Sequence, residues 1–541
     1  MLIWTGCSIG KARNFISWQS SSETFKKLVL ERPAALVAWT IAIGTAFRFA
    51  MAAAGLDFDH TEAYYIANSR SFELSYFDHP PLAFWIAWLT RTVTGADSLV
   101  TLRAPFIAMF IGTTWMMYQI GARLFDQRSG AAAALLLNLS PLFTISFSAW
   151  VQPDGPMTFL ALASILLIVR LEKVDCSRER LLSWLGVGAC LGLALLSKYA
   201  AVVVAIGLLL FAITSREHRR WFSEPGPYLG AVLALAIFSP VVIWNWKHDW
   251  VSFVFQGQRP FEYTGLRLGS LLETIAGQAA LIGPWIWVPC IQAGIWGLAR
   301  GPADWRTWLP SVLGATPIVL FSIIALWASS GGHHHWQAPG YLLLFPLVGH
   351  FVVLRLERAD ALTRNWLLAA ASTTVLLTAL MAAEISTGVF WNMLPSSYVQ
   401  NRFNPALKGL RWKELRPAFE ARGFTGQQRL FVATTARGVT GKVDFEIGDK
   451  LPVFCLCGDA RNYAFSRGSE SVVGWDAVIA IADDQEHQLL DRLGPFFEKI
   501  DPVGVVEVRR GAQLVIRLHL HYGRNYLRPY PTSPETPEEV R

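Results

Sequence analysis

Long apolar segments dominate this sequence and limit what it can fold into. A helix needs about 20 consecutive apolar residues to cross a bilayer. Of the 541 residues, 53% are hydrophobic and only 16% are charged, whereas soluble domains are about a quarter charged. We therefore predict a multi-pass α-helical membrane protein with about eleven transmembrane helices. The candidate segments are 33–54, 101–122, 130–149, 153–171, 181–197, 199–214, 227–245, 271–298, 308–328, 338–354 and 365–384.

The distribution of basic residues predicts the orientation of these segments. One alternate set of loops is rich in Arg and Lys, as in 170–180 and 216–220, whereas the turns near 150–153, 198 and 329–337 on the other side hold only Lys198. Basic loops stay on the cytoplasmic side of a membrane. The N-terminus is then cytoplasmic, and everything after residue 384 lies outside, in the periplasm of a bacterial inner (plasma) membrane. The net charge of +7 reflects this orientation and contact with membrane lipids, so no nucleic-acid partner is predicted.

The remaining segments predict the domain organisation. Residues 1–24 lack the pattern of a signal peptide and are interpreted as a disordered leader before the membrane domain at 25–384. The first outer loop, 56–100, is too long for a simple connector, and its parts 62–70 and 81–88 suggest short interfacial helices. A small α/β domain is predicted at 385–527, with a helix near 485–499 and a disordered tail at 528–541. Its expected strands are 429–434, 443–447, 452–457, 477–482, 505–508 and 514–518.

The six cysteines show no metal-binding spacing. Cys455 and Cys457 would lie on one face of a strand but about two residues' rise apart, so a bridge between them would be strained. We predict no disulfide framework.

Polar and ionisable residues gather on the predicted outer side. Asp154 begins a span, either as a helix N-cap or as a carboxylate facing a cavity. Lys198 interrupts an apolar run, either because it snorkels to the interface or because it neutralises a lipid phosphate. His335 ends a run of three histidines that suits phosphate contact or a solvated loop better than a metal site.

The acidic first outer loop is the strongest candidate for chemistry. Asp57, Asp59 and Glu62 lead into a predicted interfacial helix that carries Tyr64 and Tyr65. A carboxylate close to an acceptor hydroxyl can act as a general base. We therefore expect catalysis or substrate binding in this loop.

Several motifs, taken in order, resemble the GT-C glycosyltransferases of family 39. They are YFDHPPL at 76–82, PDGP at 153–156, GLALLSKY at 192–199 and HWQAPGY at 335–341. This family includes protein mannosyltransferases, aminoarabinose transferases of lipid A and rhizobial lipopolysaccharide galacturonosyltransferases. The resemblance implies an inverting transferase that takes a sugar from a polyprenyl-phosphate carrier, with a first-loop acid as general base and a lipid or glycan as acceptor.

The resemblance also implies roles for individual residues. Thr61 stands where many relatives have the catalytic aspartate, so the base is either Asp59, which we prefer, or Glu62. Asp78 and His79 match positions near the carrier phosphate and the metal, and they are the candidates for holding a divalent metal ion, although no cofactor is certain. Asp154 matches a second family acid near a sugar, and Lys198 a lysine facing the phosphate.

Two other functions compete with this prediction. Protein O-mannosylation would use the same donor chemistry on a different acceptor. A transporter or flippase for a lipid-linked sugar would favour ionisable residues inside the spans. The span interiors are nearly bare of charge, which favours the transferase.

Overall fold

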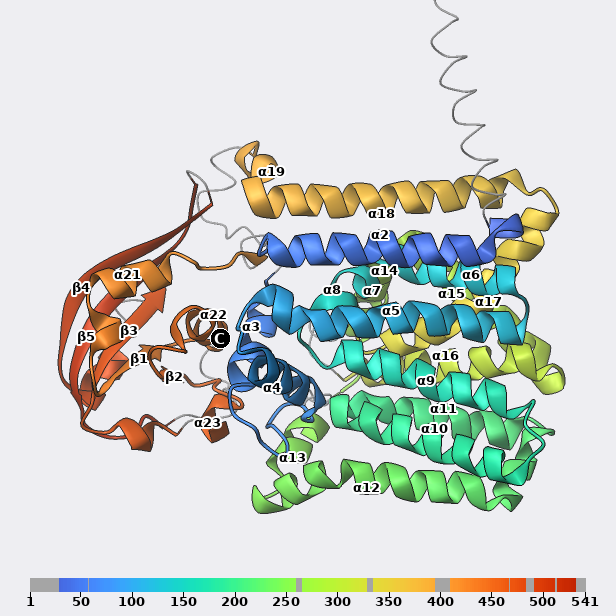
Figure 1. Cartoon of the computed structure of the whole chain (residues 1–541), viewed down its shortest axis with the longest axis horizontal. Helices are drawn as coiled ribbons and strands as arrows, with labels where there is room; N and C mark the ends of the chain where they lie inside the picture. The colour runs from blue at the N-terminus through green and yellow to red at the C-terminus, as the bar shows by residue number, and fades with distance from the viewer. Residues whose placement is uncertain are drawn as a thin grey trace, which may run out of the picture.

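A bundle of long helices is joined to a C-terminal mixed sheet in this computed structural model (Figure 1). The structure describes residues 29–56, 58–258, 265–327, 334–394, 409–466, 468–482, 491–510 and 513–531. The predicted leader, Asp57 and most of the predicted tail lie outside these ranges. The sheet region, residues 409–531, is called the C-terminal α/β region below.

Eight helices in the described ranges are long and apolar enough to cross a membrane. Two bent helix pairs raise the number to ten if each pair is one span. The helical segment Tyr199–Thr214 is shorter and does not pass. The described residues thus hold eight to ten candidate spans, and the predicted count of eleven is not confirmed. The eight helices are α2 (Pro33–Ala53), α5 (Leu99–Leu124), α9 (Asp154–Leu171), α10 (Ser177–Ser197), α12 (Pro225–Lys247), α16 (Trp305–Ile324), α17 (Ala338–Glu357) and α18 (Ala361–Thr387).

Proline accounts for both bends. The first pair joins α6 (Gln127–Leu139) to α7 (Pro141–Thr144) and α8 (Ser146–Ala149) at 79°. The second joins α14 (Leu268–Ile282) to α15 (Pro284–Arg300) at 113°, where Gly283 has a φ of 90°. A proline cannot donate the backbone hydrogen bond that would continue the preceding helix. The sequence periodicity alone did not separate these bent pairs from straight spans.

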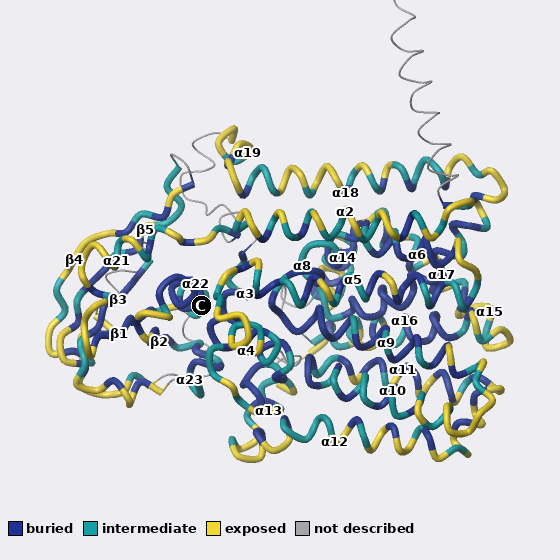
Figure 2. Tube along the Cα trace, viewed as in Figure 1, coloured by how far each residue is buried: buried dark blue, intermediate teal, exposed yellow. Residues whose placement is uncertain are grey.

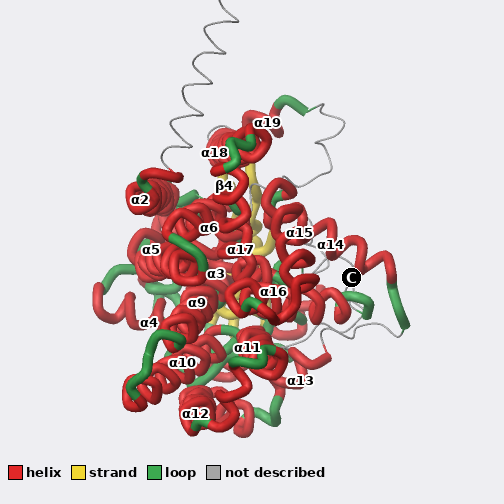
Figure 3. The backbone as a smooth tube through the Cα atoms, turned by 90° about the vertical axis from the view of Figure 1, so that its right-hand side faces the viewer, coloured by secondary structure: helices red, strands yellow, loops and turns green. Residues whose placement is uncertain are grey.

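Burial divides the bundle into central and peripheral helices. In α9 and α17, 78% of the most apolar window is buried, whereas the value is only 17% in α2 and α18. Figure 2 shows the same contrast in burial along the chain, and Figure 3 shows α2 and α18 at the edge of the bundle, with α9 and α17 inside it. The peripheral helices expose apolar side chains that suit contact with lipid.

The first loop folds into two helices, as its sequence predicted. They are α3 (His60–Asn68) and α4 (Leu82–Thr94). Helix α4 ends at Gly95, which has a left-handed φ of 64°, and such a conformation costs glycine little. The remaining short elements of the helical part are α11 (Val202–Thr214), α13 (Val251–Gln258) and α19 (Val389–Asn392).

Five strands form the C-terminal sheet, in the order β2-β1-β3-β5-β4. Strand β1 runs parallel to both β2 and β3, whereas β5 is antiparallel to β3 and β4. The strands are β1 (Leu430–Thr434), β2 (Val453–Cys455), β3 (Asp476–Ala482), β4 (Phe497–Arg510) and β5 (Gln513–Tyr526), with the helices α21 (Leu415–Ala421), α22 (Arg437–Ile447) and α23 (Tyr463–Ser466).

One prediction in this region was wrong, and another was wrong at one end. Residues 443–447 were expected as a strand but belong to helix α22. The helix is buried on two sides: Val443 and Ile447 pack in the core of the sheet, and Phe445 packs against the first loop. Because the helix is buried on two sides, its apolar residues alternate with polar ones in the sequence, as they do in a half-buried strand. The helix predicted near 485–499 extends too far, because β4 already begins at Phe497. Residues 491–493 are helical, and 483–490 lie outside the described residues.

The expectation of no disulfide was wrong as well. Cys455 and Cys457 are bonded to each other, with their Cα atoms 5.3 Å apart. Our argument assumed that both residues extend one strand. Strand β2 instead ends at Cys455, so the chain turns immediately afterwards and brings the two residues closer than an extended backbone would allow.

Candidate active site

A cavity of about 720 Å³ lies where the helical bundle meets the first loop and the C-terminal α/β region. Its wall combines apolar side chains from the bundle with ionisable side chains from three parts of the chain. The predicted site residues that line it are Tyr64, Tyr65, Asp78, His79, Asp154, Lys198 and His335. The fold thus brings together residues more than 250 positions apart in sequence.

The ends of two neighbouring spans supply an ion pair to the cavity. Asp154 is the first residue of α9, and Lys198 directly follows the last residue of α10. Because α9 and α10 run in opposite directions, Nζ of Lys198 lies 2.7 Å from Oδ1 of Asp154, and both residues are buried. Asp154 makes no N-cap hydrogen bond, since Pro153 holds the cap position. The ion pair with Lys198, and not a helix-capping role, therefore accounts for a carboxylate at this position.

Asp78 forms a second polar centre in the same wall. Its Oδ1 accepts a hydrogen bond of 2.9 Å from the Tyr64 hydroxyl, and its Oδ2 lies 3.7 Å from Nη1 of Arg461. Burial raises the pKa of Tyr64 well above its usual value, and the negative charge of Asp78 raises it further. Tyr64 therefore remains a neutral donor to Asp78.

The imidazoles of His60, His79 and His335 also line the cavity. His79 packs against Tyr65, with their ring centroids 5.7 Å apart. His333 lies outside the described residues.

Asp59 and Glu62, the two candidates for the general base in the first loop, do not line the cavity. Asp59 caps helix α3 by accepting a 2.8 Å hydrogen bond from the backbone amide of Thr61, and the side of the loop that faces the cavity carries Thr61 itself. Glu62 is fully buried, and its two oxygens accept bonds of 2.8 and 2.5 Å from Arg103. It also accepts a 3.0 Å bond from the amide of Val151. Glu62 thus ties the first loop to α5 and to the chain before α9.

The C-terminal α/β region completes the cavity wall with residues that the sequence did not point to. Arg437, Gly438 and Arg461 line the cavity. Arg437 opens α22 just after β1, and Arg461 follows β2. Ligands of α/β sheets bind outside the carboxyl ends of parallel strands, and this rule locates both arginines once β1 and β2 are known to be parallel neighbours. Only the strand order could have supplied this signal.

Close packing between α22 and α3 holds this part of the wall in place. A Cβ added at Gly441 would lie 2.7 Å from backbone atoms of Ala63 and Tyr64, so the two helices touch through a glycine. Arg70 Nε donates to Asp444 Oδ1 at 2.5 Å across the same contact. The position of the C-terminal arginines therefore depends on this docking.

No group of three or more His, Cys, Asp or Glu side chains is arranged to hold a metal ion in the part of the chain that the structure describes. Asp78, the predicted metal candidate, interacts instead with Tyr64 and Arg461. Its role toward a divalent ion stays a prediction.

Comparison with known proteins supports the resemblance noted in the sequence. Residues 78–244 match the family model of dolichyl-phosphate-mannose-protein mannosyltransferases. An undecaprenyl phosphate-α-4-amino-4-deoxy-L-arabinose arabinosyl transferase of Photorhabdus laumondii is 22% identical over 172 residues, covering 32% of this chain and 31% of the relative. Lipid A galacturonosyltransferase RgtD of Rhizobium johnstonii is 24% identical over 292 residues, covering 53% of this chain and 59% of the relative. Each match thus spans less than two thirds of the relative.

The fold comparison reaches further along the chain. The crystal structure of ArnT from Cupriavidus metallidurans bound to undecaprenyl phosphate aligns with a TM-score of 0.59 and 16% identity, covering 90% of this chain and 97% of that one. The predicted resemblance to GT-C glycosyltransferases is confirmed at the level of the fold.

Proposed function

We propose that this protein is a bacterial inner-membrane glycosyltransferase that moves a sugar from a polyprenyl-phosphate carrier to a lipid or glycan acceptor on the periplasmic side. The observation that carries the proposal is the pairing of Asp154 with Lys198 at the ends of two spans, inside a cavity large enough for a sugar phosphate. The names of the relatives, a lipid A galacturonosyltransferase and an undecaprenyl-phosphate-dependent transferase, support the same donor and acceptor classes.

Lys198 is the group we assign to the carrier phosphate. The polyprenyl tail must remain in the bilayer, so its phosphate is confined to the level of the span ends, where Lys198 lies. An ammonium group there offsets the charge that builds on the phosphate oxygen as the glycosidic bond breaks.

Asp154 is the group we assign as general base, in preference to the first-loop acids. Asp59 and Glu62 are engaged in the helix cap and the Arg103 pair and do not line the cavity. Lys198 occupies Oδ1 of Asp154, and Oδ2 receives no hydrogen bond from the described residues. In one displacement, the acceptor oxygen bonds to the anomeric carbon while the carbon–oxygen bond to phosphate breaks. The hydroxyl proton passes to Asp154, and polyprenyl phosphate leaves.

The test uses purified full-length protein in nanodiscs with a panel of synthetic undecaprenyl-phosphate sugars and lipopolysaccharide as acceptor. We expect transfer by the natural sequence and its loss in Asp154→Asn. Asp449→Asn, in an exposed ion pair of the C-terminal α/β region, is the matched control. If Asp59→Asn abolished transfer and Asp154→Asn retained it, Asp59 and not Asp154 would be the general base. Absence of transfer from every donor, with lipopolysaccharide or with a peptide, would overturn the proposal.

A further inference from the structure

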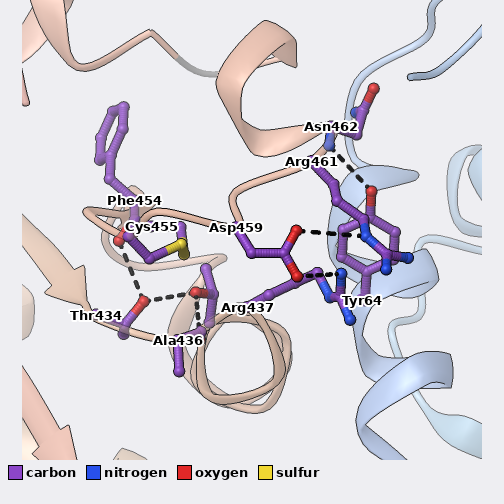
Figure 4. Close-up of a disulfide and its surroundings, with 11 residues drawn as sticks. Tyr64, Thr434, Ala436, Arg437, Phe454, Cys455, Asp459, Arg461 and Asn462 are labelled. Carbon is purple, nitrogen blue, oxygen red and sulfur yellow. Dashed lines mark hydrogen bonds and ion pairs between the residues drawn. A yellow bond between two sulfur atoms is a disulfide. The ribbon is translucent and has the colours of Figure 1, made fainter. Parts of the chain in front are cut away.

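Two arginines of the C-terminal α/β region face the cavity around one shared carboxylate. Nη1 of Arg437 lies 2.9 Å from Oδ2 of Asp459, and Nε of Arg461 lies 3.4 Å from Oδ1 of the same side chain (Figure 4). Arg461 also lies 3.7 Å from Asp78. The two guanidinium groups therefore stand side by side at one part of the wall, which we call the arginine pair.

The hydrogen-bonding capacity of the arginine pair is largely unused. A guanidinium group has five N–H donors. Arg437 donates one hydrogen bond, to Asp459. Arg461 is held by ion pairs and by its position over the Phe255 ring, without a hydrogen bond to any described residue. The Nε atom of Arg461 is buried as well. A buried donor without an acceptor costs free energy, which an anionic ligand with several oxygens would recover.

The chain fixes the arginine pair firmly. Arg461 and its neighbours follow the Cys455–Cys457 disulfide, which restrains the turn after β2 (Figure 4). Next to Arg461, the amide of Asn462 donates a 3.1 Å hydrogen bond to the Tyr64 hydroxyl, and its side chain bonds to Asn68. Preorganised donors of this kind bind anions with little loss of side-chain freedom.

The carrier phosphate is not the natural ligand of the arginine pair. That phosphate is tied to the bilayer by its tail and has Lys198 at the span ends, whereas the arginines come from the C-terminal α/β region, outside the bundle (Figure 1). A cavity of about 720 Å³ exceeds what a phosphate alone would fill. A second anion can therefore occupy the same cavity.

We propose that Arg437 and Arg461 bind a second anionic group, a carboxylate or a phosphate carried by the transferred sugar or by the acceptor. The inference rests on the proposed function and names its specificity-determining residues. Arginine binds both groups through two parallel N–H···O bonds. The C-terminal α/β region is then part of the active site and selects charged substrates over neutral ones.

The experiment measures ligand binding and does not depend on turnover. Full-length protein in nanodiscs is saturated with undecaprenyl phosphate, so that Lys198 is occupied. Binding of glucuronate and of glycerol 1-phosphate is then followed by saturation-transfer NMR, with glucose and glycerol as neutral partners. We expect at least one anion to bind about tenfold or more tightly than its neutral partner. Selective binding of glucuronate would indicate that the transferred sugar carries the charge. Selective binding of glycerol 1-phosphate would indicate that the acceptor carries it.

Two variants test the assignment to the arginine pair. Arg437→Gln removes one guanidinium, and Arg461→Lys keeps the charge beside Asp78 and Asp459 but loses the planar fork. Both should lower the preference for the anion about tenfold or more while undecaprenyl phosphate still binds. Arg416→Gln is the matched control, because Arg416 pairs with Asp449 on the exposed surface of the same region.

Three results would overturn the inference. They are equal binding of anion and neutral partner to the natural sequence, an unchanged preference in both variants, and loss of undecaprenyl phosphate binding in these variants. The last would mean that the arginines hold the carrier. Absence of sugar transfer with anion selectivity intact would instead reject the proposed function alone.

Discussion

The cavity has two walls that are built in different ways. The span-end wall, Asp154 and Lys198, is fixed by two helices that follow each other in sequence and pack side by side. The C-terminal wall, Arg437 and Arg461, reaches the cavity only because α22 docks on α3, more than 370 residues earlier in the chain. The first wall therefore depends on local packing, and the second on a long-range contact that can be weakened separately.

Asp154→Asn should break the span-end wall with the largest effect on activity. A positioned general base contributes about 10²- to 10⁴-fold to rate, and we expect a loss of kcat in this range. The amide keeps the shape of the side chain but leaves the buried Lys198 without its counter-charge, so the thermal unfolding temperature should fall as well. Steady-state transfer assays and thermal unfolding in nanodiscs measure both quantities. If Asp154→Asn lost stability but kept its kcat, Asp154 would serve the fold and not the chemistry.

Glu62→Gln should damage the support that both walls share. The change leaves Arg103 buried without its counter-charge, and breaking a buried pair of this kind costs about 3–5 kcal/mol. We expect a marked drop in the unfolding temperature. Replacing both partners, as Glu62→Gln with Arg103→Met, should recover part of the loss, because no charge then remains buried. If Glu62→Gln abolished transfer at full stability, Glu62 would be catalytic.

Gly441→Ala should disturb only the C-terminal wall. The added Cβ would meet the backbone of α3 at 2.7 Å, and overpacking of this kind costs about 1–3 kcal/mol. Hydrogen exchange should increase in α22 and α3 while α9 and α10 keep their protection. Gly426→Ala is the matched control, since nothing lies within 4 Å of a Cβ at that position. Equal exchange in both variants would show that the helices do not need this close approach.

The pH dependence of the docking contact is the smallest expected effect. Lys442 on α22 donates hydrogen bonds to the carbonyls of Phe58 and Leu410. Burial lowers the pKa of Lys442 to about 7, although Asp59 and Glu62 act in the opposite direction. Between this pKa and the ordinary value of 10.5, the unfolded chain holds a proton that the folded chain lacks. Stability should therefore rise with pH from about 7 upward, by at most about 1.4 kcal/mol per pH unit.

Lys442→Met checks this linkage. Unfolding measured between pH 7 and 9 should show a smaller rise with pH in the variant than in the natural sequence. Identical slopes in the two proteins would mean that Lys442 is protonated in the folded state throughout this range.

The sequence predicted the membrane part of the fold well and the C-terminal region less well. Apolar length located the helices of the bundle, but two of the predicted spans are bent pairs and Tyr199–Thr214 is too short. In the C-terminal region, Val443–Ile447 alternate like a strand because α22 is buried on two sides. Local pattern cannot distinguish a helix buried on both faces from a half-buried strand.

Among the site residues, the sequence identified one in the first loop and two at the ends of spans. Asp78, Asp154 and Lys198 line the cavity, as their polar character beside apolar runs suggested. For Asp59 and Glu62, a first-loop position was predictable, but the direction of each side chain was not. Within α3, Thr61 faces the cavity while Glu62, one residue on, is turned toward Arg103, because successive residues are about 100° apart around a helix.

By itself, the sequence determined that this chain is a membrane bundle with polar residues concentrated at span ends, because the cost of burying charge in lipid restricts where such residues can lie. The tertiary structure alone decided which carboxylates reach the cavity and that two arginines of the C-terminal α/β region join them. Helix rotation and the docking of α22 on α3 set those positions, and both depend on contacts between segments hundreds of residues apart.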